Sequence, residues 1–193
     1  MAAFEVTPQE RHIVVAGFYG SGHERLAAAL ARRLNYPIVT TFTRFVEGAL
    51  RSGDVEQATG CELAALKAVA GEAKEPSIID IRTPAFCRHH AQDTIKEGLG
   101  ALSIYYRVPA EACHVGIMMA DADNDVKDGA GSDLHMYNYR NYDRSATGHA
   151  DLVVEPEESS RFQALADTAI AGLVERGLLA PPLVGAGYLR IAR

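Results

Sequence analysis

The stretch from residue 12 to residue 34 constrains the fold of this chain more than any other. A short apolar run, 12–16, precedes the turn Gly17-Phe18-Tyr19-Gly20-Ser21-Gly22-His23-Glu24-Arg25, and leucines then recur at 26, 30 and 34. The run predicts a buried strand, and the leucine spacing predicts an amphipathic helix. Because glycines allow positive φ angles and a helix N-terminus attracts anions, this unit predicts a phosphate site in the turn. A glycine-rich turn without a ligand is the second interpretation.

The turn departs from the complete phosphate-loop pattern, which is Gly, four residues, Gly, Lys and then Ser or Thr. Gly17 and Gly22 have the required spacing, but His23 occupies the lysine position and Glu24 the hydroxyl position. The lysine would reach the β- and γ-phosphates, and the hydroxyl would bind magnesium. The turn therefore predicts phosphate binding without two of the usual side chains. The candidate residues are Gly17, Gly20, Ser21, Gly22, His23, Glu24 and Arg25.

Strands and helices alternate along the rest of the chain. Apolar runs predict strands at 38–42, 77–81, 102–108 and 152–154, and helical spacing predicts helices at 59–71, 83–98 and 160–177. Thr59 with Glu62, and Ser160 with Gln163, have the spacing of capping boxes. This alternation predicts an α/β fold with a parallel sheet flanked by helices.

Length and composition exclude several classes of protein. The 193 residues predict one domain over 1–193, with a small lid within it. The net charge of -6 argues against nucleic acid and anionic membranes as partners. No apolar run approaches the roughly 20 residues that cross a bilayer, and no secretory signal is visible, so a cytoplasmic protein is expected. Cys61, Cys87 and Cys113 predict reduced thiols and no metal site.

Five segments resemble the cytidylate kinase-like family of nucleoside monophosphate kinases. Residues 19–27 and 31–37 are similar to the opening of that family, whose loop reads Tyr-Gly-Ser-Gly-Gly-Arg-Glu. Residues 102–111 resemble its strand leading to an Ala-Pro-x-Glu turn. Residues 137–142, followed by 150–154, resemble its Tyr-Tyr-x-x-Tyr segment and its last strand.

The resemblance implies a P-loop kinase-like sheet and transfer of phosphate from ATP to a nucleoside monophosphate, with Mg²⁺ as the metal. In the loop, Gly20 to Gly22 would cradle the donor phosphates, and Arg25 or His23 would stand in for the lysine. Arg82 would hold the acceptor phosphate, while Arg140 or Arg144 would neutralise the transferring group. A surface arginine paired with Asp80 or Glu75 is the alternative interpretation of Arg82.

The lid or mobile loop predicted over residues 121–149 departs most from the family. Asp121, Asp123, Asp125 and Asp128 lie where the family carries basic residues, with Lys127 among them. Carboxylates there oppose the negative charge of a transferring phosphoryl group. The sequence therefore leaves two functions open: a kinase with weak or lost activity, or a silent relative that binds a nucleotide or another phosphorylated small molecule as a sensor or scaffold. The sequence does not indicate the oligomeric state.

Overall fold

The computed structural model describes residues 11–18, 20–51, 54–72, 75–109, 112–113, 142–157 and 160–180. Five strands within these ranges form one sheet in the order β2-β3-β1-β4-β5, and every neighbouring pair is parallel. The strands are β1 (Ile13–Gly17), β2 (Ile38–Thr40), β3 (Ile78–Arg82), β4 (Leu102–Tyr106) and β5 (Leu152–Val154). The predicted α/β fold with a parallel sheet is thereby confirmed.

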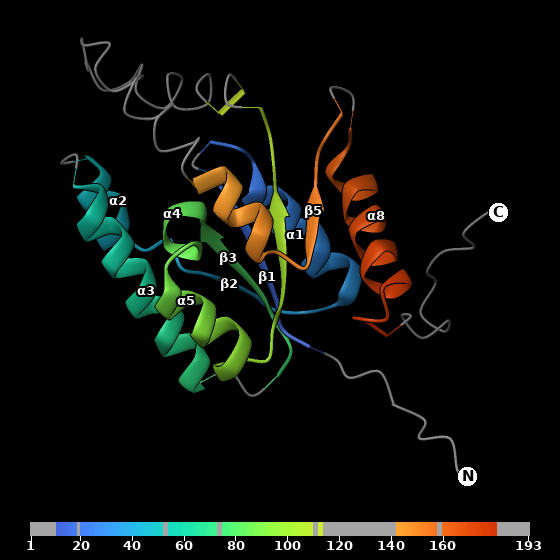
Figure 1. Ribbon diagram of the computed structural model, residues 1–193, viewed down its shortest axis with the longest axis horizontal. Coiled ribbons are helices and arrows are strands. Elements are labelled where there is room, and N and C mark those ends of the chain that lie inside the picture. Colours follow the sequence, from blue (N-terminus) through green and yellow to red (C-terminus); the bar gives the residue numbers. More distant parts are fainter. Residues whose placement is uncertain are drawn as a thin grey trace.

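Helices cover the sheet on both sides (Figure 1). Helices α1 (His23–Leu34) and α8 (Phe162–Glu175) lie together on one side, where Arg33 and Asp167 form an ion pair of 2.8 Å between them. On the other side lie α3, α4 and α5, and α2 packs against α3. Their bounds are α2 (Arg44–Arg51), α3 (Val55–Glu72), α4 (Thr83–Phe86) and α5 (His89–Asp93), followed by the π-helical turn η1 (Thr94–Gly98). Residues 142–149 are also helical.

The hydrophobic core lies on both faces of the three central strands. All five residues of β1, of β3 and of β4 are buried, as expected for parallel strands between two helical layers. A smaller cluster of Val46, Ala49 and Ala58 joins α2 to α3. This arrangement places the carboxyl ends of β1, β3 and β4 side by side, which is the edge where open α/β sheets bind ligands.

Two details of the predicted helices are wrong. Helix α3 begins at Val55, so Thr59 and Glu62 lie inside it rather than at a capping box, and Glu62 is instead drawn into a buried ion pair. Helix α8 has Arg161 as its N-cap residue with no side-chain cap hydrogen bond, so Ser160 does not cap it. Helix α2 was not predicted at all.

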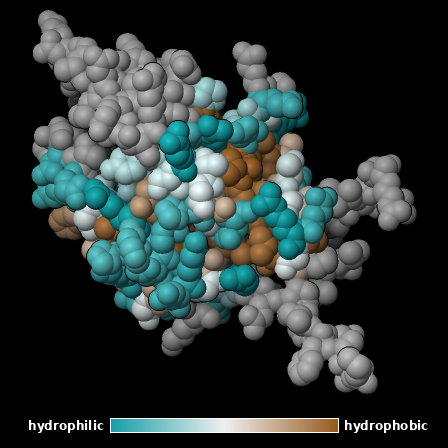
Figure 2. Space-filling view, viewed as in Figure 1, coloured by the Kyte–Doolittle hydropathy of each residue, from teal (hydrophilic) through white to brown (hydrophobic). Residues whose placement is uncertain are grey.

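The surface character, the helix lengths and the cysteines complete the description of the fold. Most of the face in Figure 2 is hydrophilic, with an apolar area near β5. Within the described ranges no helix is long and apolar enough to cross a membrane. Cys61, Cys87 and Cys113 are free thiols, as predicted.

Candidate functional site

The glycine-rich turn joins the end of β1 to the start of α1, as the sequence predicts. Gly20 and Gly22 have φ angles of 72° and 87°, in the left-handed region that side chains with a Cβ avoid. Gly22 is the N-cap residue of α1. Gly17 is needed for another reason, because a Cβ on it would lie 2.4 Å from the Cβ of His23. The three glycines therefore allow the chain to fold back over the end of β1.

Backbone amides of this turn are partly engaged within the turn itself. The Ser21 amide donates to the Phe18 carbonyl at 3.0 Å, and the His23 amide donates to Ser21 Oγ at 3.3 Å. No hydrogen bond among the described residues uses the amides of Gly22 or Glu24. The hydroxyl oxygen of Ser21 thus occupies the position at the His23 amide that an anion's oxygen would take.

His23, at the lysine position, is a buried and neutral side chain. It is 6% exposed, and burial lowers its pKa from 6.5 to about 4, while the positive charge of Arg82 acts in the same direction. A hydrogen bond with the Phe18 backbone opposes this change only in part. His23 Nδ1 lies 3.2 Å from Ser21 Oγ and 3.4 Å from Glu24 Oε2. The second distance is short enough for an ion pair, but the lowered pKa leaves the imidazole uncharged at neutral pH.

Arg82 ends β3 directly beside the turn, since its Cα pairs with that of Gly17 across the sheet. Its side chain is 4% exposed, and Nη2 lies 2.9 Å from Oε2 of Glu62, which is fully buried. The ring of Phe42 lies 6.0 Å from the guanidinium carbon. The sequence offered Asp80 or Glu75 as partners for this arginine, and the structure pairs it with Glu62.

The buried Arg82–Glu62 pair is incompletely hydrogen-bonded. Nε of Arg82 is buried without a hydrogen-bond partner, and Nη2 meets Oε2 of Glu62 as an ion pair at 2.9 Å without a well-formed hydrogen bond. Oε1 of Glu62 accepts from the Arg82 amide and from the Thr41 hydroxyl, both at 3.3 Å. Each unsatisfied buried donor costs on the order of 1–3 kcal/mol. The guanidinium therefore has unused capacity for an acceptor.

Asp80 lies two residues before Arg82 on β3 and is 7% exposed. Burial raises its pKa to about 6, and the charges of Glu62 and Glu24 add to the change, while a 3.2 Å hydrogen bond from Thr40 opposes it. Its Oδ1 has no hydrogen-bond partner. In the part of the chain that the structure describes, no three metal-binding side chains come together.

Phe162, the first residue of α8, closes one side of the turn. Its Cζ would lie 3.2 Å from a Cβ on Gly22, and the guanidinium of Arg25 lies 4.4 Å from its ring centre. The ring of Tyr106, at the end of β4, is 6.1 Å away. Arg25 is thus stacked on an aromatic ring rather than extended into the turn. The sequence treats Phe162 only as part of an apolar helix face, and no local signal reveals this contact.

Arg107 follows β4 and holds three segments together at the carboxyl edge. It donates to both carboxylate oxygens of Asp143, at 2.9 and 2.8 Å, and to Glu155 at 2.8 Å. The hydroxyl of Tyr105 donates to Asp143 at 2.9 Å. These bonds fix the helical residues 142–149 and the segment after β5 to the sheet. The sequence analysis did not single out Arg107.

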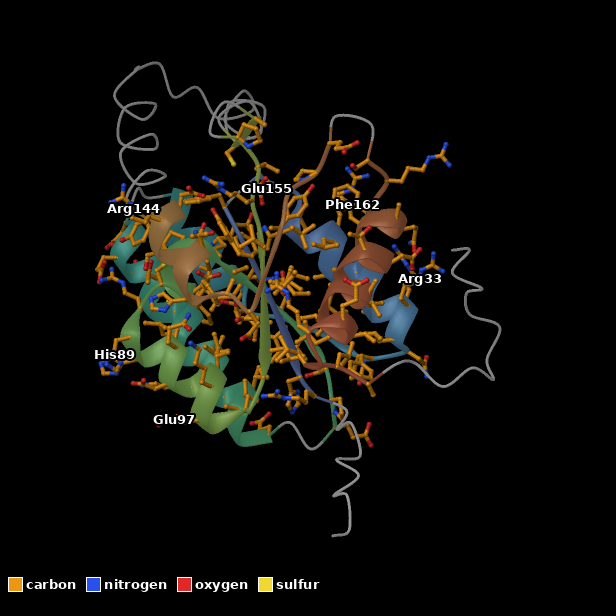
Figure 3. The ribbon with its side chains drawn as sticks, turned by 45° about the vertical axis from the view of Figure 1, so that its right-hand side comes forward. Arg33, His89, Glu97, Arg144, Glu155 and Phe162 are labelled. Carbon is orange, nitrogen blue, oxygen red and sulfur yellow. The ribbon has the colours of Figure 1, made fainter. Side chains whose placement is uncertain are left out.

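The remaining candidates lie apart from the turn or outside the description. Arg144 is exposed on the helical segment 142–149, and in Figure 3 it lies on the opposite side of the view from Phe162. Arg140 and residues 121–141 of the proposed lid lie outside the described residues. The roles assigned to Arg82, Arg140 and Arg144 remain predictions. Phe162 and Glu155 are at the carboxyl end of the sheet in the same view.

Comparison with solved structures decides which fold this is. A shikimate kinase from Bacteroides thetaiotaomicron superposes with a TM-score of 0.67 at 17% identity, over 86% of this chain and 98% of its own. A shikimate kinase from Acinetobacter baumannii in complex with shikimate superposes with a TM-score of 0.67 at 14% sequence identity. The match covers 90% of this chain and 97% of the kinase. The chain has the fold of P-loop kinases. A gluconokinase from Sinorhizobium meliloti 1021 superposes with a TM-score of 0.61 at 16% sequence identity. The match covers 87% of this chain and 94% of the gluconokinase. No family model and no curated protein matches the sequence of this P-loop kinase-fold chain.

Proposed function

We propose that this protein binds a nucleoside triphosphate at the turn of residues 17–25 and transfers its terminal phosphoryl group to a small-molecule acceptor. One observation carries the proposal. Gly20 and Gly22 hold left-handed conformations in a turn between β1 and α1, at the centre of a sheet with the P-loop kinase strand order. In such folds the amides at this turn bind the donor phosphates, and catalysis consists mainly of positioning and charge stabilisation.

The acceptor would lie at the same edge of the sheet, over the ends of β2 and β3. The resemblance to the cytidylate kinase-like family favours a nucleoside monophosphate. The structural neighbours are named as shikimate kinase and gluconokinase, so hydroxy acids, phosphorylated on an alcohol hydroxyl, are the next class of acceptor to test. In either case ATP with Mg²⁺ is the donor, because the phosphates need a divalent cation to offset their charge.

A second candidate function is nucleotide binding without turnover, and the neutral His23 favours it. Two unit charges 4 Å apart attract by about 1 kcal/mol in water and about 4 kcal/mol near a protein surface. A tenfold change in rate corresponds to about 1.4 kcal/mol. The missing lysine charge therefore lowers the rate of phosphoryl transfer by roughly five-fold to 10³-fold. We therefore expect turnover below the ~1–100 per second usual for kinases.

Calorimetry and turnover assays on the same preparation separate these functions. Binding of ATP with Mg²⁺ should be measured first, and then ADP release with a panel of nucleoside monophosphates, shikimate and gluconate. Acceptor-dependent ADP release supports the kinase, and ATP binding without release supports the silent relative. Gly22→Val should abolish binding, while Gly60→Ala, on an open helical position, should leave it intact. Failure of the wild-type protein to bind any nucleotide would refute both.

A further inference from the structure

The turn of this protein carries two basic side chains, and neither is a free lysine-like cation among the described residues. His23 is buried and its pKa lies at about 4, so it is neutral. Arg25 is stacked on Phe162, with 4.4 Å between the guanidinium carbon and the ring centre. A triphosphate in the turn would therefore meet backbone amides and the exposed guanidinium of Arg25, but no charged side chain at the lysine position, which is His23. The charge that a lysine would supply there has to come from another element.

Arg82 is the arginine that the sheet brings to this turn. Its Cα is paired with Gly17 across β3 and β1, and His23 folds over the same glycine. The charge of Arg82 acts on His23, which places the guanidinium within electrostatic range of the turn. Arg82 is therefore next to the phosphate site in space, although it lies far from the turn in the sequence.

The state of the Arg82 side chain points to a missing acceptor. It is 4% exposed, yet Nε and Nη2 have no hydrogen-bond partner. Glu62 neutralises the charge through a 2.9 Å contact without satisfying these donors. A planar guanidinium whose Nε has no acceptor, and whose Nη2 is engaged only by the ion pair with Glu62, can meet the oxygens of a phosphate group.

We propose that Arg82, rather than His23 or Arg25, supplies the positive charge to the phosphates bound at the turn, and that Glu62 holds Arg82 in place until they arrive. This inference rests on the proposed function, because it requires that the turn binds phosphates. It differs from the expectation that Arg82 holds the phosphate of an acceptor. Here the partner of Arg82 is the donor nucleotide, so the contact forms without the small molecule that receives the phosphoryl group.

The test removes both charges of the pair at once, so that no unpaired buried charge remains. Arg82→Gln/Glu62→Gln should lower the affinity for ATP and for pyrophosphate at least tenfold in calorimetry. The matched control is Arg33→Gln/Asp167→Asn, which removes the ion pair between α1 and α8 and should change affinity less than twofold. Glu62→Gln alone should raise the affinity several-fold, because it frees the guanidinium. His23→Gln should not lower it.

A measurement on the wild-type protein covers the case in which the double variant fails to fold. The Nε–H resonance of Arg82 in a ¹⁵N spectrum should shift when pyrophosphate is added, since that group would gain an acceptor. An unshifted resonance while pyrophosphate binds, or a folded double variant with wild-type affinity, would overturn the role of Arg82 and leave nucleotide binding standing. Absence of pyrophosphate and ATP binding in the wild type would overturn the proposed function together with this assignment.

Discussion

The pH dependence of stability tests the charge state of His23, on which the argument about the turn depends. In the unfolded chain this histidine has its ordinary pKa of 6.5, and in the folded protein burial lowers the pKa to about 4. Between these values the unfolded state binds more protons, so the free energy of unfolding falls as the pH falls from 6.5 to 4. The difference of about 2.5 pKa units corresponds to a loss of about 3 kcal/mol.

Asp80 acts in the opposite direction over nearly the same range. Its pKa rises from 3.8 in the unfolded chain to about 6 in the folded protein, because burial disfavours the carboxylate. The folded state therefore binds more protons between these values, and the free energy of unfolding falls as the pH rises from 3.8 to 6. This loss is also about 3 kcal/mol, so the contributions of His23 and Asp80 nearly cancel in the wild-type protein.

Single substitutions separate the two contributions. Relative to wild type, His23→Gln should gain up to about 3 kcal/mol of stability from pH 6.5 to pH 4, and Asp80→Asn should gain a similar amount from pH 4 to pH 6. Urea unfolding at half-unit pH intervals measures both differences, and contributions common to all variants drop out. A wild-type-like slope for His23→Gln would mean that burial does not lower the pKa of His23, and the account of His23 as a buried neutral side chain would be wrong.

Three further substitutions test other parts of the site. His23→Lys should raise ATP affinity about tenfold in calorimetry by restoring a cation; no gain would show that the turn cannot place one. Gly22→Ala should lower the free energy of unfolding by about 1–2 kcal/mol, because its φ of 87° disfavours a Cβ, whereas Gly60→Ala should raise it slightly in the same denaturation assay. Asp143→Asn should cost about 1–2 kcal/mol by weakening the bonds from Arg107 and Tyr105; unchanged amide exchange in residues 142–149 would contradict this.

Local patterns in the sequence are sufficient for the framework of the site. An apolar run with β-branched residues, followed by glycines and by leucines at helical spacing, predicts β1, the turn and α1, because each depends on contacts within a few residues. The alternation of strands and helices likewise predicts a parallel sheet, since parallel neighbours need a crossover between them. The short helix α2 was not predicted from the sequence, and the structure shows it packed against α3 through Val46, Ala49 and Ala58.

The sequence by itself therefore determined the strand–turn–helix unit, the spacing of Gly17 and Gly22, and the class of fold. Only the tertiary structure decided what the charged residues of the site do. Whether His23 carries a second proton depends on its burial, and whether Arg82 is available to a ligand depends on Glu62, which α3 brings to Arg82 from another part of the chain. Burial and charge pairing depend on the distance between elements in space. The spacing of residues along one strand or helix does not determine that distance.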